Sequence, residues 1–271
     1  MKRTVAGTVA ALTLGASLLY AHDLFIRLDS YFLAPNSSVV VRVINGTFFK
    51  SENWITRDRV TDISMVSATG RARIDTTQWS ASRDSLTTLL SVRTGAAGVV
   101  VLGASTKARD LHLEAADFNE YLRVDGIPDV LEARRQNNEL GLAAWERYAK
   151  HVKAVVQVGD NTSGPFDTVL GYPAEIIPLV NPYTLRAGGT LRIRCLVNGQ
   201  PVANQLVIVG GDGRSGPIAD RSFRTDAAGE VAFTIPEAGS WFAKFINMTR
   251  VRSEAELDYV SQWATLTFGV R

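Results

Sequence analysis

The sequence predicts a mainly β fold made of two antiparallel β-sandwich domains, the first of which contains a helical insertion. Short apolar runs rich in β-branched residues, separated by Gly, Pro, Asn and Asp, fill two long stretches of the chain. Between these stretches the apolar spacing changes from two residues to three or four, which is typical of helices. Apolar residues make up 46% of the chain and there is a single cysteine, so we expect hydrophobic cores rather than disulfides to stabilise both domains.

Residues 1–21 have the pattern of a secretory signal peptide. Lys2 and Arg3 precede an apolar run, 5–19, that is too short and too rich in Gly, Ala and Thr for a stable membrane span. We predict cleavage after Ala21, with cleavage near residues 16–17 and an uncleaved anchor as the alternatives. The mature protein is therefore predicted to be periplasmic or secreted, with no stable membrane span after cleavage.

The charge balance gives no reason to expect a nucleic-acid partner. Loss of Lys2 and Arg3 with the leader lowers the 29 basic residues to 27, equal to the 27 acidic residues. No basic cluster with interleaved aromatic residues occurs in the sequence. Cys195, the single cysteine, lies in an alternating apolar run, so we predict an inert thiol in the core.

The first domain is predicted to span 22–160, with a helical insertion over 111–152. Its apolar spacing predicts three helices, around Phe118 and Tyr121, after Pro128, and from Leu142 to Val152. The strands are predicted in short runs between turn residues: Leu24–Leu28, Ser38–Ile44, Thr61–Val66, Ala72–Asp75, Ser85–Val92, Gly98–Gly103 and Lys153–Val158.

Residues 161–173 are polar and interrupted by Gly and Pro, which indicates a linker before a second domain, 174–271. A set of seven strands in roughly 100 residues is typical of an immunoglobulin-like or prealbumin-like sandwich. The strands are predicted at Glu175–Leu179, Thr190–Val197, Gln205–Val209, Ser222–Thr225, Glu230–Ile235, Trp241–Met248 and Gln262–Val270.

Candidate metal ligands are few, because the chain has only three histidines, His22, His112 and His151. If cleavage follows Ala21, His22 becomes the first residue and could chelate a transition metal ion through its α-amine and Nδ1, with Asp23 adding an oxygen. The alternative is that His22 and Asp23 only begin the first strand. His112, at a helix entry, and His151, packed between layers, are weaker candidates. None of the three belongs to an H-E-x-x-H motif.

No set of residues for nucleophilic catalysis is found, since G-x-S-x-G, S-x-x-K and C-x-x-C motifs are missing. We therefore predict a protein that is not an enzyme. Four tryptophans lie in or near β segments, where exposed rings could stack on sugars and buried rings would belong to the core. They are Trp54, Trp79, Trp241 and Trp263.

Several short motifs follow one another in a characteristic order. They are Ala21-His22-Asp23, Phe118-Asn119-Glu120-Tyr121-Leu122, Glu146-Arg147-Tyr148-Ala149-Lys150, Asn198-Gly199-Gln200-Pro201-Val202, Gly239-Ser240-Trp241 and Trp263-Ala264-Thr265-Leu266-Thr267-Phe268. In this order they resemble a bacterial periplasmic family, the domain-of-unknown-function 4198 family, whose members are often described as periplasmic components of nickel or cobalt uptake. The resemblance implies export, a C-terminal sandwich and transition-metal handling, with His22 as the matching position. One departure is Asn247, where relatives often carry His.

The sequence thus predicts an exported, non-enzymatic binding protein that handles a transition metal ion (Ni, Co or Cu) in the periplasm. A metal-uptake permease or an outer-membrane receptor would then be its partner. The alternative is a metal-independent β-sandwich module that binds a glycan, a peptide or a cell-envelope protein.

Overall fold

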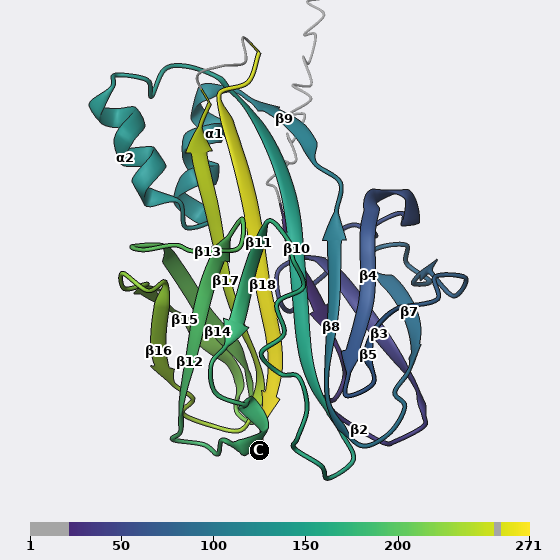
Figure 1. The fold of residues 1–271 in the computed structure, drawn as a ribbon. Coiled ribbons are helices and arrows are strands. Elements are labelled where there is room, and N and C mark those ends of the chain that lie inside the picture. The colour runs from purple at the N-terminus through teal and green to yellow at the C-terminus, as the bar shows by residue number, and fades with distance from the viewer. Residues whose placement is uncertain (1–21, 252–255) are drawn as a thin grey trace, which may run out of the picture.

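The computed structural model describes residues 22–251 and 256–271, and the predicted leader, residues 1–21, lies outside them. Within the described residues the protein is mainly β, with three sheets and two short α-helices (Figure 1). No helix in this part of the chain is long and apolar enough to cross a membrane. The predicted β-sandwich fold is confirmed.

The strands form a central ten-stranded sheet and a four-stranded sheet on either side of it. The first outer sheet has the order β1 (Asp23–Arg27), β3 (Ser38–Gly46), β7 (Thr88–Arg93) and β6 (Ser80–Ala81). The second outer sheet contains β11 (Ala174–Pro178), β12 (Thr190–Val197), β13 (Gln200–Pro201) and β16 (Glu230–Thr234). The central sheet has the order β15 (Gly216–Arg224), β14 (Leu206–Gly213), β17 (Gly239–Arg250), β18 (Tyr259–Val270), β10 (Ala144–Val158), β8 (Gly98–Thr106), β4 (Val60–Ser67) and β5 (Gly70–Arg73), with β2 (Phe32–Leu33) and β9 (Arg109–Leu113) also paired to β10.

The central sheet crosses the predicted domain boundary. The neighbours along its main path are antiparallel except for β10 and β18, which pair in parallel from Glu146 opposite Tyr259 to Ala154 opposite Thr267. Figure 1 shows these long strands side by side at the centre of the molecule. The predicted linker, 161–173, forms no helix or strand. The division into domains at that linker stays a prediction, although both halves share one sheet.

The two outer sheets pack on opposite faces of this central sheet. On one face the hydroxyls of Thr265 and Thr267 donate hydrogen bonds to the β1 carbonyls of Leu24 (2.7 Å) and Ile26 (2.6 Å). On the other face Lys153 of β10 binds Glu175 of β11. Because side chains alternate along a strand, residues of β10 one position apart face different outer sheets.

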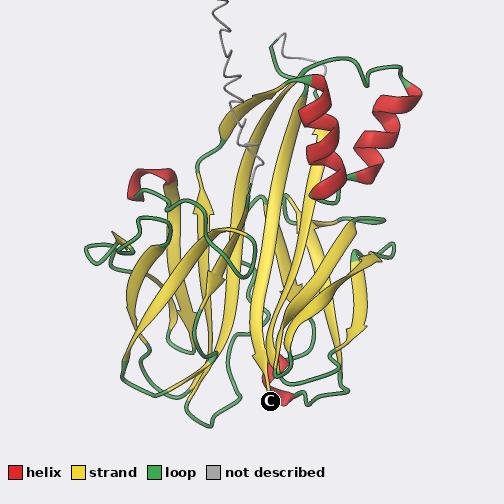
Figure 2. Ribbon diagram, turned by 180° about the vertical axis from the view of Figure 1, so that it is seen from behind, coloured by secondary structure: helices red, strands yellow, loops and turns green. Residues whose placement is uncertain are grey.

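Two helices cover the first of these faces near one end of the long strands (Figure 2). They are α1 (Ala115–Val124) and α2 (Pro128–Gln136), and both were predicted from their apolar spacing and from Pro128. The ring of Tyr121 stacks on that of Trp263 with 6.2 Å between ring centroids. Gly126, with φ of +79°, ends α1 in the left-handed conformation that glycine adopts without strain.

The third predicted helix, Leu142 to Val152, is wrong, because this segment forms the first part of β10. Its apolar residues match a helical spacing, but several of its polar side chains are buried in the sheet. The β pattern was therefore hidden by polar residues in core positions, namely Glu146, Lys150, His151 and Lys153. By contrast, the prediction for Cys195 is confirmed: it is buried, and burial raises the pKa of its thiol.

Candidate functional site

Two cavities meet at His22, where the chain enters β1. The first, about 460 Å³ in volume, lies between the β3–β4 connection and strands β9 and β10. The second, about 500 Å³, lies between the turn after β3, the end of α1 and strands β15 and β17. His22 lines both cavities and is partly exposed. The start of β1 is therefore the point at which two ligand-sized spaces adjoin.

The imidazole of His22 is held beside an acidic side chain. Its Nε2 lies 3.1 Å from Oε2 of Glu52. The chain turns back after β3, where Thr47 N–H donates to Lys50 O (3.0 Å), and Glu52 N–H then donates to Asn45 O (2.9 Å), which fixes Glu52 next to β1. Burial lowers the pKa of His22, which the nearby Glu52 counteracts. The ring is therefore neutral at pH 7, the form that can bind a metal ion.

Asp23 points to the second cavity, where it forms a buried ion pair with Lys244 of β17. Burial alone would lower the pKa of Lys244, but Asp23 and Asp125 outweigh it and the pKa is raised. Burial and the Asp23 charge raise the pKa of Asp125 to about 7, and its Oδ2 has no hydrogen-bond partner among the described residues. Asp23 is thus already neutralised by a lysine, whereas Asp125 is not.

The second cavity is acidic on balance. Four carboxyl groups line it and only one ammonium group opposes them, while phenylalanine rings form its apolar wall. The carboxyl groups belong to Asp23, Glu52, Asp125 and Asp220, and the ammonium to Lys244. Such a charge balance favours a cation over an anion.

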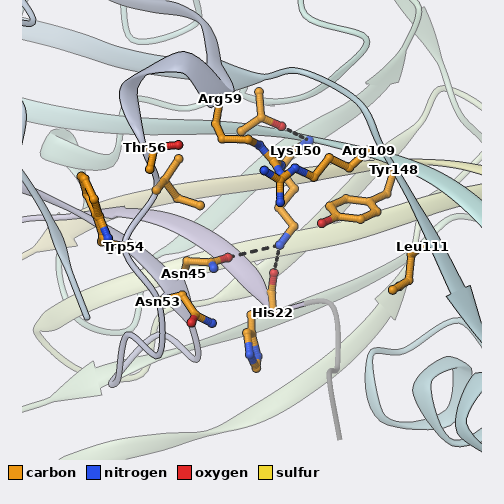
Figure 3. Close-up of a pocket in the computed structure, with 12 residues that line it drawn as sticks. His22, Asn45, Asn53, Trp54, Thr56, Arg59, Arg109, Leu111, Tyr148 and Lys150 are labelled. Carbon is orange, nitrogen blue, oxygen red and sulfur yellow. Dashed lines mark hydrogen bonds between the residues drawn. The ribbon is translucent and has the colours of Figure 1, made fainter. Parts of the chain in front are cut away.

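Lys150 of β10 is buried and lines the first cavity. Its Nζ donates hydrogen bonds to the carbonyl of His22 and to Oδ1 of Asn45, 3.3 Å away (Figure 3). Burial lowers the pKa of Lys150 to about 8. Nearby, burial raises the pKa of Glu146 to about 7, and Tyr121 Oη donates to its Oε1 at 3.0 Å. These groups change charge close to neutral pH.

The structure does not bring the three histidines together. His112 lies within strand β9 and not at a helix entry, as was predicted, because this segment pairs with β10. It is exposed and packs against the ring of Trp145, with 4.8 Å between ring centroids. His151 lies on the face of β10 opposite to Lys150, with Nδ1 2.9 Å from Ser105 Oγ and Nε2 2.8 Å from Gln262 Oε1. Burial lowers the pKa of His151, so it is a neutral core residue with both nitrogens engaged.

Asn247 does not extend a site at His22 either, since its side chain donates to Gln205 Oε1 at 2.9 Å.

Among the tryptophans, Trp241 and Trp263 are buried in the core, and Trp79 is partly buried with its indole N–H donating to Ile55 O (2.9 Å). Trp54 alone of the four is exposed, at 39%, and it lines the first cavity.

Sequence reasoning missed most of the residues around His22. Glu52, Arg59 and Arg109 lie in or next to polar connections that carry no recognisable motif. Lys244 did leave a signal, because it is a lone charge inside the apolar run Trp241–Met248. A charged residue in a predicted core strand requires a buried partner, and that partner is Asp23.

Fold and cavities together define a β-sandwich protein with two adjoining polar cavities at the start of its first strand. In sequence, the chain belongs to the family described as Domain of unknown function (DUF4198), which matches residues 19–249. No functionally curated protein matches the chain.

Similar solved structures include the D0-D1 domain of intimin, with 13% identity over 91% of this chain and 97% of that chain, and a TM-score of 0.23. Dimeric latent PorU from Porphyromonas gingivalis has 12% identity over 92% and 20% of the two chains (TM-score 0.21). A tetra-tandem repeat from the extending region of a large adhesion protein has 10% identity over 92% and 49% (TM-score 0.21). At such TM-scores these structures do not define the fold, which rests on the strand pairing described above.

Proposed function

We propose that this protein is an exported binding protein that holds a transition metal ion (Ni, Co or Cu) at His22, on the side of the acidic cavity. The observation that carries the proposal is the contact of 3.1 Å between His22 Nε2 and Glu52 Oε2 at the edge of that cavity. A carboxylate at this distance favours the proton on Nε2 and so leaves Nδ1 free to bind a metal ion.

Cleavage after Ala21 would supply a second ligand, because the new α-amine and Nδ1 belong to the same residue and can chelate one ion. The described residues contain no group of three or more His, Cys, Asp or Glu that could hold a metal ion. The remaining coordination positions would therefore be filled by water or by the ligands with which the metal arrives. Such a site suits transfer of an ion from one partner to another better than permanent storage.

Electrostatics favours the acidic side of His22. Lys150, which donates to the His22 carbonyl, opposes a cation on its own side while it is protonated. Asp125 has no hydrogen-bond partner at Oδ2 among the described residues and lines the acidic cavity. A bound cation would compensate part of the cost of ionising its carboxyl group.

The test is a titration of exported protein whose N-terminus has been established by intact-mass measurement. Ni²⁺ and Cu²⁺ are titrated into wild type, His22→Ala and Glu52→Gln by calorimetry. We expect His22→Ala to abolish binding and Glu52→Gln to weaken it about tenfold, the usual effect of losing a carboxylate that orients a metal-binding histidine. His112→Ala is the matched control, because His112 is exposed and packs only against Trp145 among aromatic rings. Unchanged affinity in His22→Ala, or a mature terminus other than His22, would refute the chelate.

A second function is favoured by one observation. Trp54 exposes its ring at the mouth of the first cavity, as expected for a metal-independent module that stacks an aromatic side chain on a sugar. In that case binding of an envelope glycan should depend on Trp54 and be unaffected by Glu52→Gln, because Glu52 does not line the first cavity.

A further inference from the structure

The first cavity is lined by basic side chains that form no ion pair with any described residue. Its lining includes Arg59, Arg109 and Lys150, and no acidic residue is among the described residues that line it. Figure 3 shows the three cationic side chains approaching the cavity from the β3–β4 connection, β9 and β10. Three cations around one space with no carboxylate is an unfavourable arrangement unless an anion enters it.

Arg59 is the most unusual of the three. It is only 9% exposed, and its Nε is buried with no hydrogen-bond partner among the described residues. Its side chain forms no ion pair there either, although a guanidinium always carries its charge and has five N–H groups to satisfy. The backbone explains its fixed position: Arg59 N–H donates to Thr56 O (3.1 Å), and Arg59 O accepts from Lys107 N–H (2.8 Å).

The other two cations are also available to a ligand. In the described residues the Arg109 side chain makes no hydrogen bond and no ion pair. Asp58, whose carboxylate Arg109 influences at longer range, lies outside the cavity and is engaged chiefly by Thr56. Lys150 Nζ donates only to carbonyl oxygens, those of His22 and of the Asn45 side chain, and forms no ion pair with a described residue. The carboxyl groups of Asp23, Asp125 and Glu146 act on its charge only at longer range.

We propose that this cavity binds a small organic carboxylate. Arg59 and Arg109 donate hydrogen bonds to the carboxylate, and the buried Lys150 ammonium attracts it electrostatically. The planar fork of a guanidinium matches the two oxygens of a carboxylate. The rest of the lining suits an organic body rather than a bare inorganic anion, since it contains Trp54, Ile55, Leu111 and Tyr148, with the Asn45 and Asn53 amides for polar substituents. A volume of about 460 Å³ admits a molecule of metabolite size.

This site does not depend on the proposed metal site, although His22 lines both cavities. The experiment therefore uses metal-free protein spanning 22–271 in a cationic buffer. Citrate, benzoate and glucuronate are titrated separately by calorimetry, with inorganic phosphate and sulfate as comparison anions. The three probes distinguish a compact polyacid, an aromatic acid and an acidic sugar.

We expect at least one carboxylate to bind, and Arg59→Gln to weaken it about 30-fold or more, as for loss of one partner of a buried charge pair. Arg109→Gln, at a more exposed position, should have a smaller effect. Lys107→Gln is the matched control, because it removes a nearby exposed charge that does not line the cavity. Failure of all three carboxylates to bind, tighter binding of phosphate, or an equal loss in Lys107→Gln would overturn the proposal.

A stability measurement distinguishes a variant that has lost the binding site from one that has misfolded. Removing a buried charge without a partner should leave the melting temperature of unliganded Arg59→Gln equal to or above that of wild type. Arg59→Lys keeps the positive charge but lacks the planar guanidinium group, so its affinity for the carboxylate should lie between those of wild type and Arg59→Gln. A lower melting temperature in unliganded Arg59→Gln would mean that Arg59 has a structural role, and would overturn its assignment as a ligand-binding residue.

Discussion

Side chains around His22 change charge near neutral pH, so pH should affect the binding of the two proposed ligands differently. Lys150 has a pKa of about 8 and Asp125 a pKa of about 7, both shifted chiefly by burial. As the pH rises through this range, Asp125 gains a negative charge and Lys150 loses a positive one. Both changes make the surroundings of His22 more negative.

The two cavities should therefore respond to pH in opposite directions. Between pH 6 and pH 9 we expect metal affinity to rise, because Asp125 ionises and Lys150 becomes neutral. Over the same range carboxylate affinity should fall as the Lys150 ammonium is lost. Titrations at several pH values in wild type and in Lys150→Gln would check this. In Lys150→Gln the carboxylate affinity should be low at every pH, and parallel pH profiles for the two ligands would contradict the assignment.

Strand β10 shows how charged residues are accommodated inside an element. Lys153 and Glu175 are both almost completely buried and their charged atoms lie 2.7 Å apart. The Glu175 carboxylate also accepts the backbone N–H groups of Leu170, Gly171 and Tyr172 at 2.7–2.9 Å. One glutamate thus links β10 to β11 and holds the end of the segment between them.

Loss of Glu175 should consequently destabilise the protein more than loss of Lys153. Lys153→Met leaves a carboxylate that still has three N–H donors, and it deprives only the Thr168 carbonyl of its donor. Glu175→Leu leaves three backbone donors without a partner and a buried ammonium that keeps only its hydrogen bond to Thr168 O (2.8 Å). We expect Glu175→Leu to lower the free energy of unfolding by about 2 kcal/mol more than Lys153→Met, since each orphaned buried donor costs roughly 1 kcal/mol. Urea unfolding at pH 7 measures both. The double variant should remain less stable than wild type.

Arg224→Gln, which breaks an exposed ion pair with Asp129, serves as the surface control and should change stability far less. If the double variant of Lys153 and Glu175 were as stable as wild type, the backbone contacts of Glu175 would contribute nothing.

The same strand marks the limit of what the sequence could predict. Two elements with a regular apolar spacing were predicted correctly: the strand Thr190–Val197 has the bounds of β12, and the helix predicted around Phe118 is α1. In β10 buried charges replaced the apolar residues that reveal a strand, so its first half was assigned to a helix. The cavities could not be predicted for a related reason, because Glu52, Arg59 and Arg109 acquire their roles only when distant segments pack together.

At the scale of the whole molecule, the pairing of β10 with β18 is the decisive feature. It joins the two halves of the chain through a continuous parallel ladder, from Glu146 opposite Tyr259 to Ala154 opposite Thr267. A parallel pair between strands more than 100 residues apart leaves no local signature in sequence. Apolar residues from both halves also belong to one hydrophobic cluster, including Val155, Leu191 and Leu266.

The halves should therefore fold and unfold as one unit, even though the linker between them lacks regular structure. We expect urea unfolding of the protein spanning 22–271 to show a single transition, with the same midpoint by tryptophan fluorescence and by far-ultraviolet circular dichroism. The separate pieces 22–160 and 174–271 should each fail to fold, because each would expose a long unpaired strand edge and half of the shared core. Mixing 22–160 with a piece 161–271, which retains the core residues Leu170 and Tyr172, should restore the native spectrum. Two separated transitions, or a 174–271 piece that folds alone with its own cooperative melt, would show that the halves are independent domains, with the shared sheet contributing little to stability.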